Sequence, residues 1–254
     1  MANTGAIIAA RGVGPDNGVT AIDASAEIVA FSDGSPVRLR QNGRLAKPMG
    51  LEFSVKTGDH VPWESRNEQH ALWHAEMNSG VVSYRAQPHT LRLVMEGRRA
   101  SYTPDLLLEG VDGAIDIVEV KDTFEEKKDP EYTDKLNRAD IIYHSLGWSF
   151  TIVTKAELEA EPAFSEVELL HRYRKAALQI DHMHAAQAVL ATGPTTLKAL
   201  RRILPPDPVG LAQLSAMIVH RIVGVDLTNG LADDAVVALP DAWAWPKPFT
   251  RVVH

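Results

Sequence analysis

Three charged residues stand in a short stretch whose other residues are mostly apolar. Asp105 directly follows Pro104, and Glu119 and Lys121 lie two positions apart in the run AIDIVEVK, residues 114–121. Because side chains alternate between the two faces of a strand, Glu119 and Lys121 would project to one side, about 6.6 to 6.8 Å apart along the backbone. A solvated strand face is the alternative explanation for this acid and base.

The spacing of Asp105 and Glu119 indicates a metal site. A neighbouring antiparallel strand lies about 4.7 to 4.9 Å away, so a hairpin can bring the two carboxylates together. Partly desolvated carboxylates at this distance repel, which raises one pKa unless a cation lies between them. A divalent metal removes the conflict and lowers the pKa of a bound water from roughly 15.7 to about 7. Lys121 could orient or deprotonate that water, or neutralise a phosphate, so the residues fit metal-assisted phosphodiester hydrolysis.

The elements around these residues are expected to form a mixed α/β sheet. A helix is expected at 65–80, where Ser65 and Glu68 form a capping-box pattern and Gly80 provides a stop. A second helix should begin at Asp129–Pro130 and end at Gly147. Strands are expected at 81–88, 91–97, 102–110, 114–121 and 148–154.

A second unit is expected from residue 161 onward, with a long helix at 165–191. Two shorter helices, at 195–204 and 210–222, and two short strands would follow it. This order is that of a winged helix, whose second short helix, 210–222, would read a DNA groove. Residues 170–221 include seven Lys or Arg and two acidic residues, which gives this stretch a local charge of +5.

Composition limits the class of protein. The 254 residues carry a formal charge of -7, 45% are hydrophobic, and there is no cysteine. Disulfides and thiolate zinc sites are therefore excluded, which leaves oxygen-ligated magnesium or manganese as the natural metal class. With neither an apolar run of about 18 residues nor a secretory signal, the sequence predicts a soluble, cytoplasmic protein. The acidic charge argues against a protein that coats nucleic acid through bulk electrostatics.

The P-D and E-x-K pattern, with its surroundings, resembles a known nuclease group. The stretches ESRNEQHALWHAEMNSGVVSYRAQP, YTPDLLLE, IVEVK and DKLNRADIIYHSLGWSFTIVTK are similar to the N-terminal catalytic domain of TnsA-type transposase endonucleases, within the PD-(D/E)xK superfamily. The resemblance covers roughly Glu64–Lys155. It implies a restriction-endonuclease-like mixed sheet flanked by helices, and the later helices resemble the family's winged-helix domain. We expect an N-terminal segment at 1–60, a nuclease domain at 61–160 and a winged-helix-like domain at 161–254.

The resemblance also implies roles for individual residues. The catalytic set would be Glu68, Asp105, Glu119 and Lys121, with the three acids holding Mg²⁺ or Mn²⁺. Glu64 competes with Glu68 for the role of helix acid, and the capping box by itself also explains a Glu at 68. Candidate DNA contacts are Gln87, Arg98, Arg99, Lys198, Arg201 and Arg202.

The function implied is DNA hydrolysis at the 5' ends of a mobile element during cut-and-paste transposition. The partners would be double-stranded DNA, a DDE transposase subunit that cuts the 3' ends, and an AAA+ regulator, in a bacterial or phage-encoded system. Two alternatives stay open from the sequence. One is a standalone PD-(D/E)xK nuclease in defence, repair or phage DNA processing; the other is a non-catalytic DNA-binding adaptor.

Overall fold

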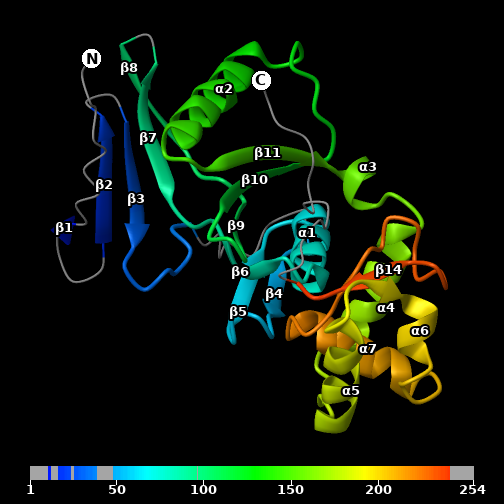
Figure 1. The fold of residues 1–254 in the computed structure, drawn as a ribbon. Helices are drawn as coiled ribbons and strands as arrows, with labels where there is room; N and C mark the ends of the chain where they lie inside the picture. Colours follow the sequence, from blue (N-terminus) through cyan, green and yellow to red (C-terminus); the bar gives the residue numbers. More distant parts are fainter. Residues whose placement is uncertain (1–10, 13–16, 24–25, 39–47, 96, 241–254) are drawn as a thin grey trace.

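A four-stranded mixed sheet forms the centre of the fold, seen in the computed structural model that describes residues 11–12, 17–23, 26–38, 48–95 and 97–240 (Figure 1). Its strand order is β11-β10-β9-β6, with antiparallel pairs except for the parallel pair β10–β11. Parallel neighbours need a crossover, and α2, Pro130–Ser145, supplies it. The strands are β6 Val81–Ala86, β9 Leu106–Gly110, β10 Ile115–Lys121 and β11 Ser149–Thr154. The expected mixed α/β architecture is confirmed.

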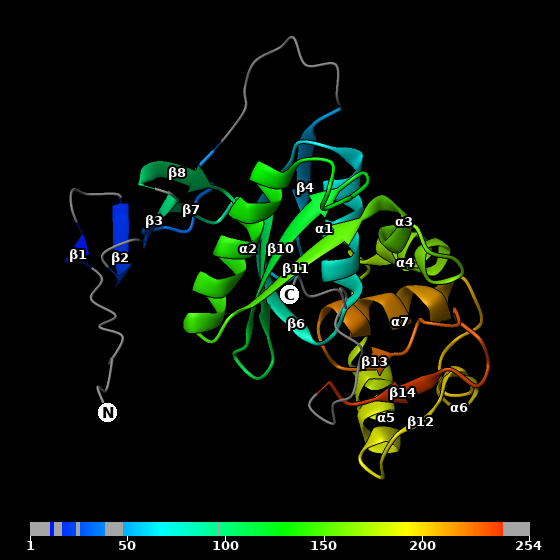
Figure 2. The ribbon, with the colours of Figure 1, turned by 90° about the horizontal axis from the view of Figure 1, so that it is seen from above.

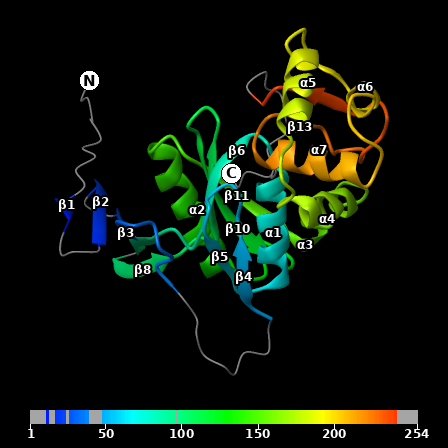
Figure 3. The ribbon, with the colours of Figure 1, turned by 90° about the horizontal axis from the view of Figure 1, so that it is seen from below.

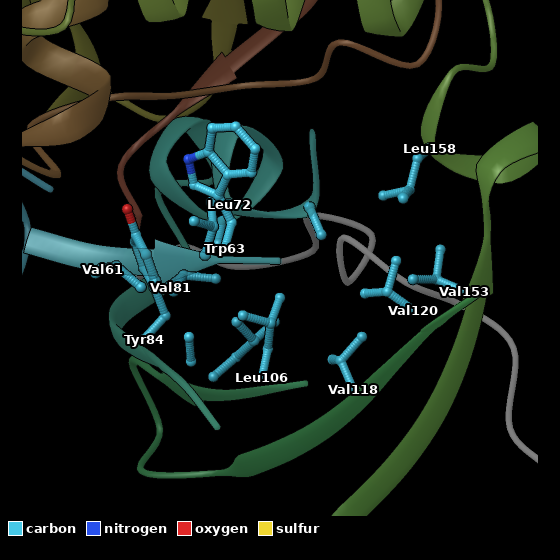
Figure 4. Close-up of a cluster of buried hydrophobic side chains, with 14 residues drawn as sticks. Val61, Trp63, Leu72, Val81, Tyr84, Leu106, Val118, Val120, Val153 and Leu158 are labelled. Carbon is cyan, nitrogen blue, oxygen red and sulfur yellow. The ribbon is translucent and has the colours of Figure 1, made fainter. Parts of the chain in front are cut away.

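Two helices cover opposite faces of this sheet. Figure 2 shows α1, Arg66–Met77, on one side of β10 and β11 and α2 on the other. On the α1 side, Leu72 packs in a buried cluster with Leu106, Val118 and Val120 (Figure 4). On the α2 side, Ile117 belongs to a second cluster that includes Leu136, Ala139 and Tyr143 of α2. Burial on both faces explains the continuous apolar character of β10.

The alternation along β10 places the charged pair. Val118 and Val120 point into the α1-side cluster, whereas Ile117 points to the α2 side. Because residues two apart share a face of a strand, Glu119 and Lys121 project with Ile117 toward α2. The sequence expectation that Glu119 and Lys121 lie on the same side is confirmed, since the Lys121 Nζ donates to Glu119 Oε1 at 2.5 Å.

A second, antiparallel sheet lies beside the first, in the order β1-β2-β3-β7-β8. Its buried face, through Ile28, Leu91 and Tyr102, joins the α2-side cluster. Its strands are β1 Arg11–Gly12, β2 Asn17–Asp23, β3 Ala26–Phe31, β7 Thr90–Met95 and β8 Arg98–Tyr102. A separate hairpin of β4, Gly50–Phe53, and β5, His60–Trp63, runs into α1.

The C-terminal helices gather beside α1, away from the second sheet (Figure 3). α4 and α7 pack together and both contact α1. A small sheet in the order β12-β14-β13 completes this part. The elements are α3 Lys155–Leu158, α4 Ala163–Tyr173, α5 Ile180–Leu190, β12 Thr195–Thr196, α6 Leu197–Arg201, α7 Val209–Val219, β13 Gly224–Val225 and β14 Val236–Ala238.

The prediction of one long helix at 165–191 is wrong, because the chain turns between α4 and α5. The Gln213 side chain of α7 accepts a hydrogen bond from the Gln179 backbone N–H and donates to the Ala177 carbonyl, each at 2.9 Å. These bonds satisfy backbone groups that a continuous helix would have paired internally. No glycine or proline lies between residues 174 and 180, so the break comes from this tertiary contact.

The expectation that residues 210–222 read a DNA groove is contradicted by burial. α7 contains no charged residue between 209 and 219, and Leu214, Ala216, Met217 and Ile218 are each at most 1% exposed. α7 contacts α1 and α4, so it is part of the protein core. Among the described helices, none is long and apolar enough to cross a membrane.

Candidate active site

The hairpin of β9 and β10 brings Asp105 level with Glu119. Leu106 pairs with Val118 across the hairpin, so the next residue outward on each strand is Asp105 and Glu119. Asp105 is held there from both sides: its Oδ2 accepts the Val120 backbone N–H at 2.8 Å, and its carbonyl accepts the Gln87 N–H at 2.8 Å. The proximity expected from sequence is therefore present, through backbone bonds that fix the Asp105 position.

Glu119 is almost fully buried, at 4% exposure, and each of its oxygens is hydrogen-bonded. Oε1 accepts from Lys121 Nζ at 2.5 Å and from the Tyr132 hydroxyl at 2.6 Å. Oε2 accepts from the Tyr102 hydroxyl at 2.6 Å. Short, charge-assisted bonds of this kind hold a carboxylate in one orientation. Glu119 thus has a fixed position between β8, β10 and α2.

Glu68 lies in the first turn of α1 and acts there as a cap. Its Oε2 accepts the Glu64 backbone N–H at 2.7 Å, and its Oε1 accepts the Ser65 hydroxyl at 2.9 Å. Ser65 in turn accepts the Glu68 N–H at 3.2 Å. Glu64, the competing helix acid, forms an ion pair with Arg38 at 3.3 Å. The capping role left open by the sequence is therefore present in the structure, and the metal role of Glu68 stays a prediction.

A cavity of about 480 Å³ joins these groups. It lies where the start of α1, the end of β8, the hairpin of β9 and β10, and the first turns of α2 meet. All four residues expected to be catalytic line it. The lining comprises Arg38, Glu64, Ser65, Asn67, Glu68, Ser101, Tyr102, Thr103, Asp105, Glu119, Val120, Lys121, Asp122, Tyr132 and Lys135.

The electrostatics of the cavity disfavour a second negative charge. Burial raises the pKa of Asp105 well above its usual range, and the nearby Glu119 and Glu68 raise it further. The Val120 N–H and Lys121 act in the opposite direction but do not offset these effects. Burial also raises the pKa of Glu68. A cation bound at Asp105 would relieve this repulsion.

The donor chemistry fits a hard divalent ion. The carboxylates of Asp105, Glu119 and Glu68 supply only oxygen, which suits Mg²⁺ or Mn²⁺. Within the described ranges, however, no three His, Asp or Glu side chains are already grouped to hold a metal. Mg²⁺ commonly uses only one or two carboxylates and keeps several waters, so the pair Asp105 and Glu119 would fit this class of ion.

The six candidate DNA contacts all lie outside the lining of this cavity. Gln87 is 2% exposed, which counts against its contact with DNA. Arg98 and Arg99 are exposed at the outer end of β8, whose other end, Tyr102, reaches Glu119. On α6, Lys198 and Arg201 both pair with Asp233, at 3.3 and 3.5 Å, and Arg202 is exposed.

Sequence reasoning missed the two tyrosines and a further lysine at this cavity. Tyr102 stands three residues before Asp105, and Tyr132 follows the helix cap Asp129 by three. The Asp129 cap places Tyr132 in the first turn of α2, whose start is directed to the site by the chain leaving β10. Tyr132 lies in the first turn of the helix that follows the E-x-K strand, and this position is the sequence signal that could have identified it. Lys135, one turn further along, follows from the same reasoning.

The mixed α/β sheet and its carboxylate-lined cavity lie largely in one stretch of the chain, and this stretch has a counterpart among known families. Residues 78–155 match a family model described as TnsA-like endonuclease N terminal, which confirms the resemblance drawn from sequence over that stretch. The matched range contains Asp105, Glu119, Lys121 and Tyr132. It begins at residue 78, so Glu68 lies outside it. A domain of this kind implies a nuclease with DNA as its substrate. No curated protein matches the chain significantly.

Proposed function

We propose that this chain is a metal-dependent endodeoxyribonuclease that hydrolyses phosphodiesters at the 5' ends of a mobile element during cut-and-paste transposition. The observation that carries the proposal is the meeting of Asp105, Glu119 and Lys121 in one cavity, within the TnsA-like stretch. The raised pKa of Asp105 beside two other acids supports a cation at this point.

Asp105 and Glu119 would hold Mg²⁺, with Mn²⁺ as a substitute and Glu68 as a third candidate ligand. When bound, the ion supplies a water of lowered pKa and positive charge for the phosphoryl oxygens. Lys121 would turn its ammonium from Glu119 to a phosphate oxygen, or hold the attacking water by hydrogen bonding. The hydroxyls of Tyr102 and Tyr132 keep Glu119 oriented when Lys121 moves.

The partners proposed are a DDE transposase subunit and an AAA+ regulator. A nuclease confined to a complex could have low DNA affinity by itself, and the net charge of -7 is consistent with that. We divide the chain into an N-terminal segment at 1–60, a nuclease domain at 61–160 and a winged-helix-like domain at 161–254. The order α5, β12, α6, α7, β13, β14 supports the last assignment. With α7 buried, α6 would be the helix that offers Lys198, Arg201 and Arg202 to DNA.

Nicking of supercoiled DNA with Mg²⁺ or Mn²⁺, with and without the partner subunits, tests this function. We expect Asp105→Asn and Lys121→Ala to lower the rate at least about 100-fold, the scale of losing one electrostatic contact to a transition state. Asp112→Asn is the matched control, because Asp112 is an exposed turn residue of the same hairpin. Equal rates for all four proteins would reject the site. Strong nicking by the purified chain alone would reject dependence on partners and favour the standalone nuclease.

A further inference from the structure

The Tyr132 ring lies against two lysines at the cavity. Lys121 Nζ and Lys135 Nζ are each 4.7 Å from the ring centroid. Tyr132 and Lys135 are three residues apart on α2 and therefore share a face of the helix. An aromatic face attracts ammonium groups, so one ring keeps two like charges at the same cavity.

Lys135 differs from the other cations that line the cavity. Lys121 is bound to Glu119, and Arg38 is paired with Glu64. Lys135 forms no ion pair with any described residue, and its contact is with the Tyr132 ring. A lysine without a carboxylate partner keeps its full charge available for a ligand that enters the cavity.

We propose that Lys135 binds a DNA backbone phosphate at the mouth of the cavity and that Tyr132 is the residue that positions it. This inference rests on the proposed nuclease function and adds a contact outside the E-x-K motif. The ligand is an anion, because the available group is an ammonium that borders the same cavity as Lys121. Phosphates flanking the scissile one are the anions that duplex DNA presents along such a surface.

The two parts of Tyr132 have separable roles. Its ring contacts the lysines, whereas its hydroxyl donates to Glu119 at 2.6 Å. Tyr132→Phe keeps the ring and removes the hydroxyl; Tyr132→Leu removes both. DNA affinity measured without divalent ions should therefore depend on the ring and not on the hydroxyl. The phenylalanine variant should bind like wild type.

The test is the salt dependence of binding to a fluorescent DNA duplex, measured by anisotropy in EDTA so that no cleavage occurs. Each phosphate contact contributes about 0.9 to the slope of log affinity against log salt. We expect Lys135→Gln to lose about that much slope, and to bind roughly eightfold more weakly at about 0.1 M salt. Lys175→Gln is the matched control, because Lys175 also lies over a ring, Phe53 at 4.8 Å, outside the cavity lining. It should bind like wild type.

Tyr132→Leu should lose part of the same slope, and the double variant with Lys135→Gln should bind no more weakly than Lys135→Gln alone. Such non-additivity is expected when one residue acts through the other. A wild-type slope for Lys135→Gln, or an equal loss in Lys175→Gln, would overturn the contact, as would DNA binding too weak to detect at about 0.05 M salt. Additive losses in the double variant would overturn the positioning role of Tyr132.

The nicking assay separates this inference from the proposed function. If Asp105→Asn abolishes nicking while Lys135→Gln keeps the full salt slope, the nuclease stands and the phosphate contact falls. If Lys135→Gln loses slope in a protein that never nicks DNA, the contact stands and the nuclease falls.

Discussion

Removal of the Arg174 guanidinium should destabilise the whole chain, because this guanidinium neutralises a buried acid on another element. Arg174 caps the end of α4, and its Nη2 binds Oε1 of Glu52 on β4. The two side chains are 13% and 11% exposed. Glu52 Oε2 also accepts from Gln69 Nε2 and Trp73 Nε1 of α1, both at 3.4 Å. Glu52 thus links the C-terminal helices to the segment that leads into α1.

We expect Arg174→Met to lower the free energy of unfolding by about 3 kcal/mol, the lower end of the usual cost of breaking a buried ion pair. Methionine keeps an apolar chain of similar length, so most of the loss comes from the buried Glu52 charge, which would keep, among the described residues, only the His171 ring at 3.4 Å and the two neutral donors of α1 as partners. Arg172→Met is the matched control. Arg172 lies two residues away and pairs with Glu168 at 2.7 Å, but these side chains are 65% and 40% exposed. An exposed pair of this type contributes at most about 1 kcal/mol.

Urea unfolding at 25 °C, followed by tryptophan fluorescence and by circular dichroism, gives both free energies. The m-value should not change if the chain still unfolds as one cooperative unit. The double variant Glu52→Gln with Arg174→Met should recover most of the loss, because the buried charge is then absent. Two results would refute the reasoning: an equal cost for Arg172→Met and Arg174→Met, or a double variant whose cost is the sum of the two single ones.

Two further predictions concern other buried positions. Gly210→Ala should destabilise by about 2 kcal/mol in the same urea assay, since a Cβ there would lie 2.2 Å from the Pro205 carbonyl oxygen; a wild-type midpoint would contradict this. Burial lowers the pKa of His89 from 6.5 to about 4. The unfolded chain therefore binds more protons between these values, and stability present above about pH 6.5 is lost on acidification, by roughly 2 kcal/mol at about pH 5. His89→Gln, which can keep the bond to the Tyr143 hydroxyl, should flatten this dependence; an unchanged pH profile of unfolding would exclude His89 as its source.

The parts of the fold that sequence predicted are those set by local signals. The Asp129–Pro130 start of α2 and the Ser65 cap of α1 both appear as expected, because each places a side-chain acceptor against free helix N–H groups. The period-2 alternation in β10 correctly placed Glu119 and Lys121 on one face. These signals depend only on neighbours in the chain.

The parts that sequence could not predict depend on contacts between distant elements. The break between α4 and α5 is held by Gln213, more than 30 residues away. The burial of α7 follows from its packing on α1 and α4, although its apolar composition already favoured a core position over a DNA surface. Tyr102 and Tyr132 meet at Glu119 only because β8 and α2 converge there.

The two acids of the hairpin differ in how far the protein itself compensates their charge. Glu119 already has three donors, including the Lys121 ammonium, so its charge is compensated by the protein itself. Among the described residues, only the Val120 N–H donates to the Asp105 carboxylate, while Glu119 and Glu68 oppose its ionisation. Under the proposed function, Asp105 would therefore be the carboxylate that benefits most from a dication, and Lys121 would be free to leave Glu119 if Glu119 shared that ion. The hydrogen bonds from Tyr102 and Tyr132 would keep Glu119 in its orientation during such an exchange.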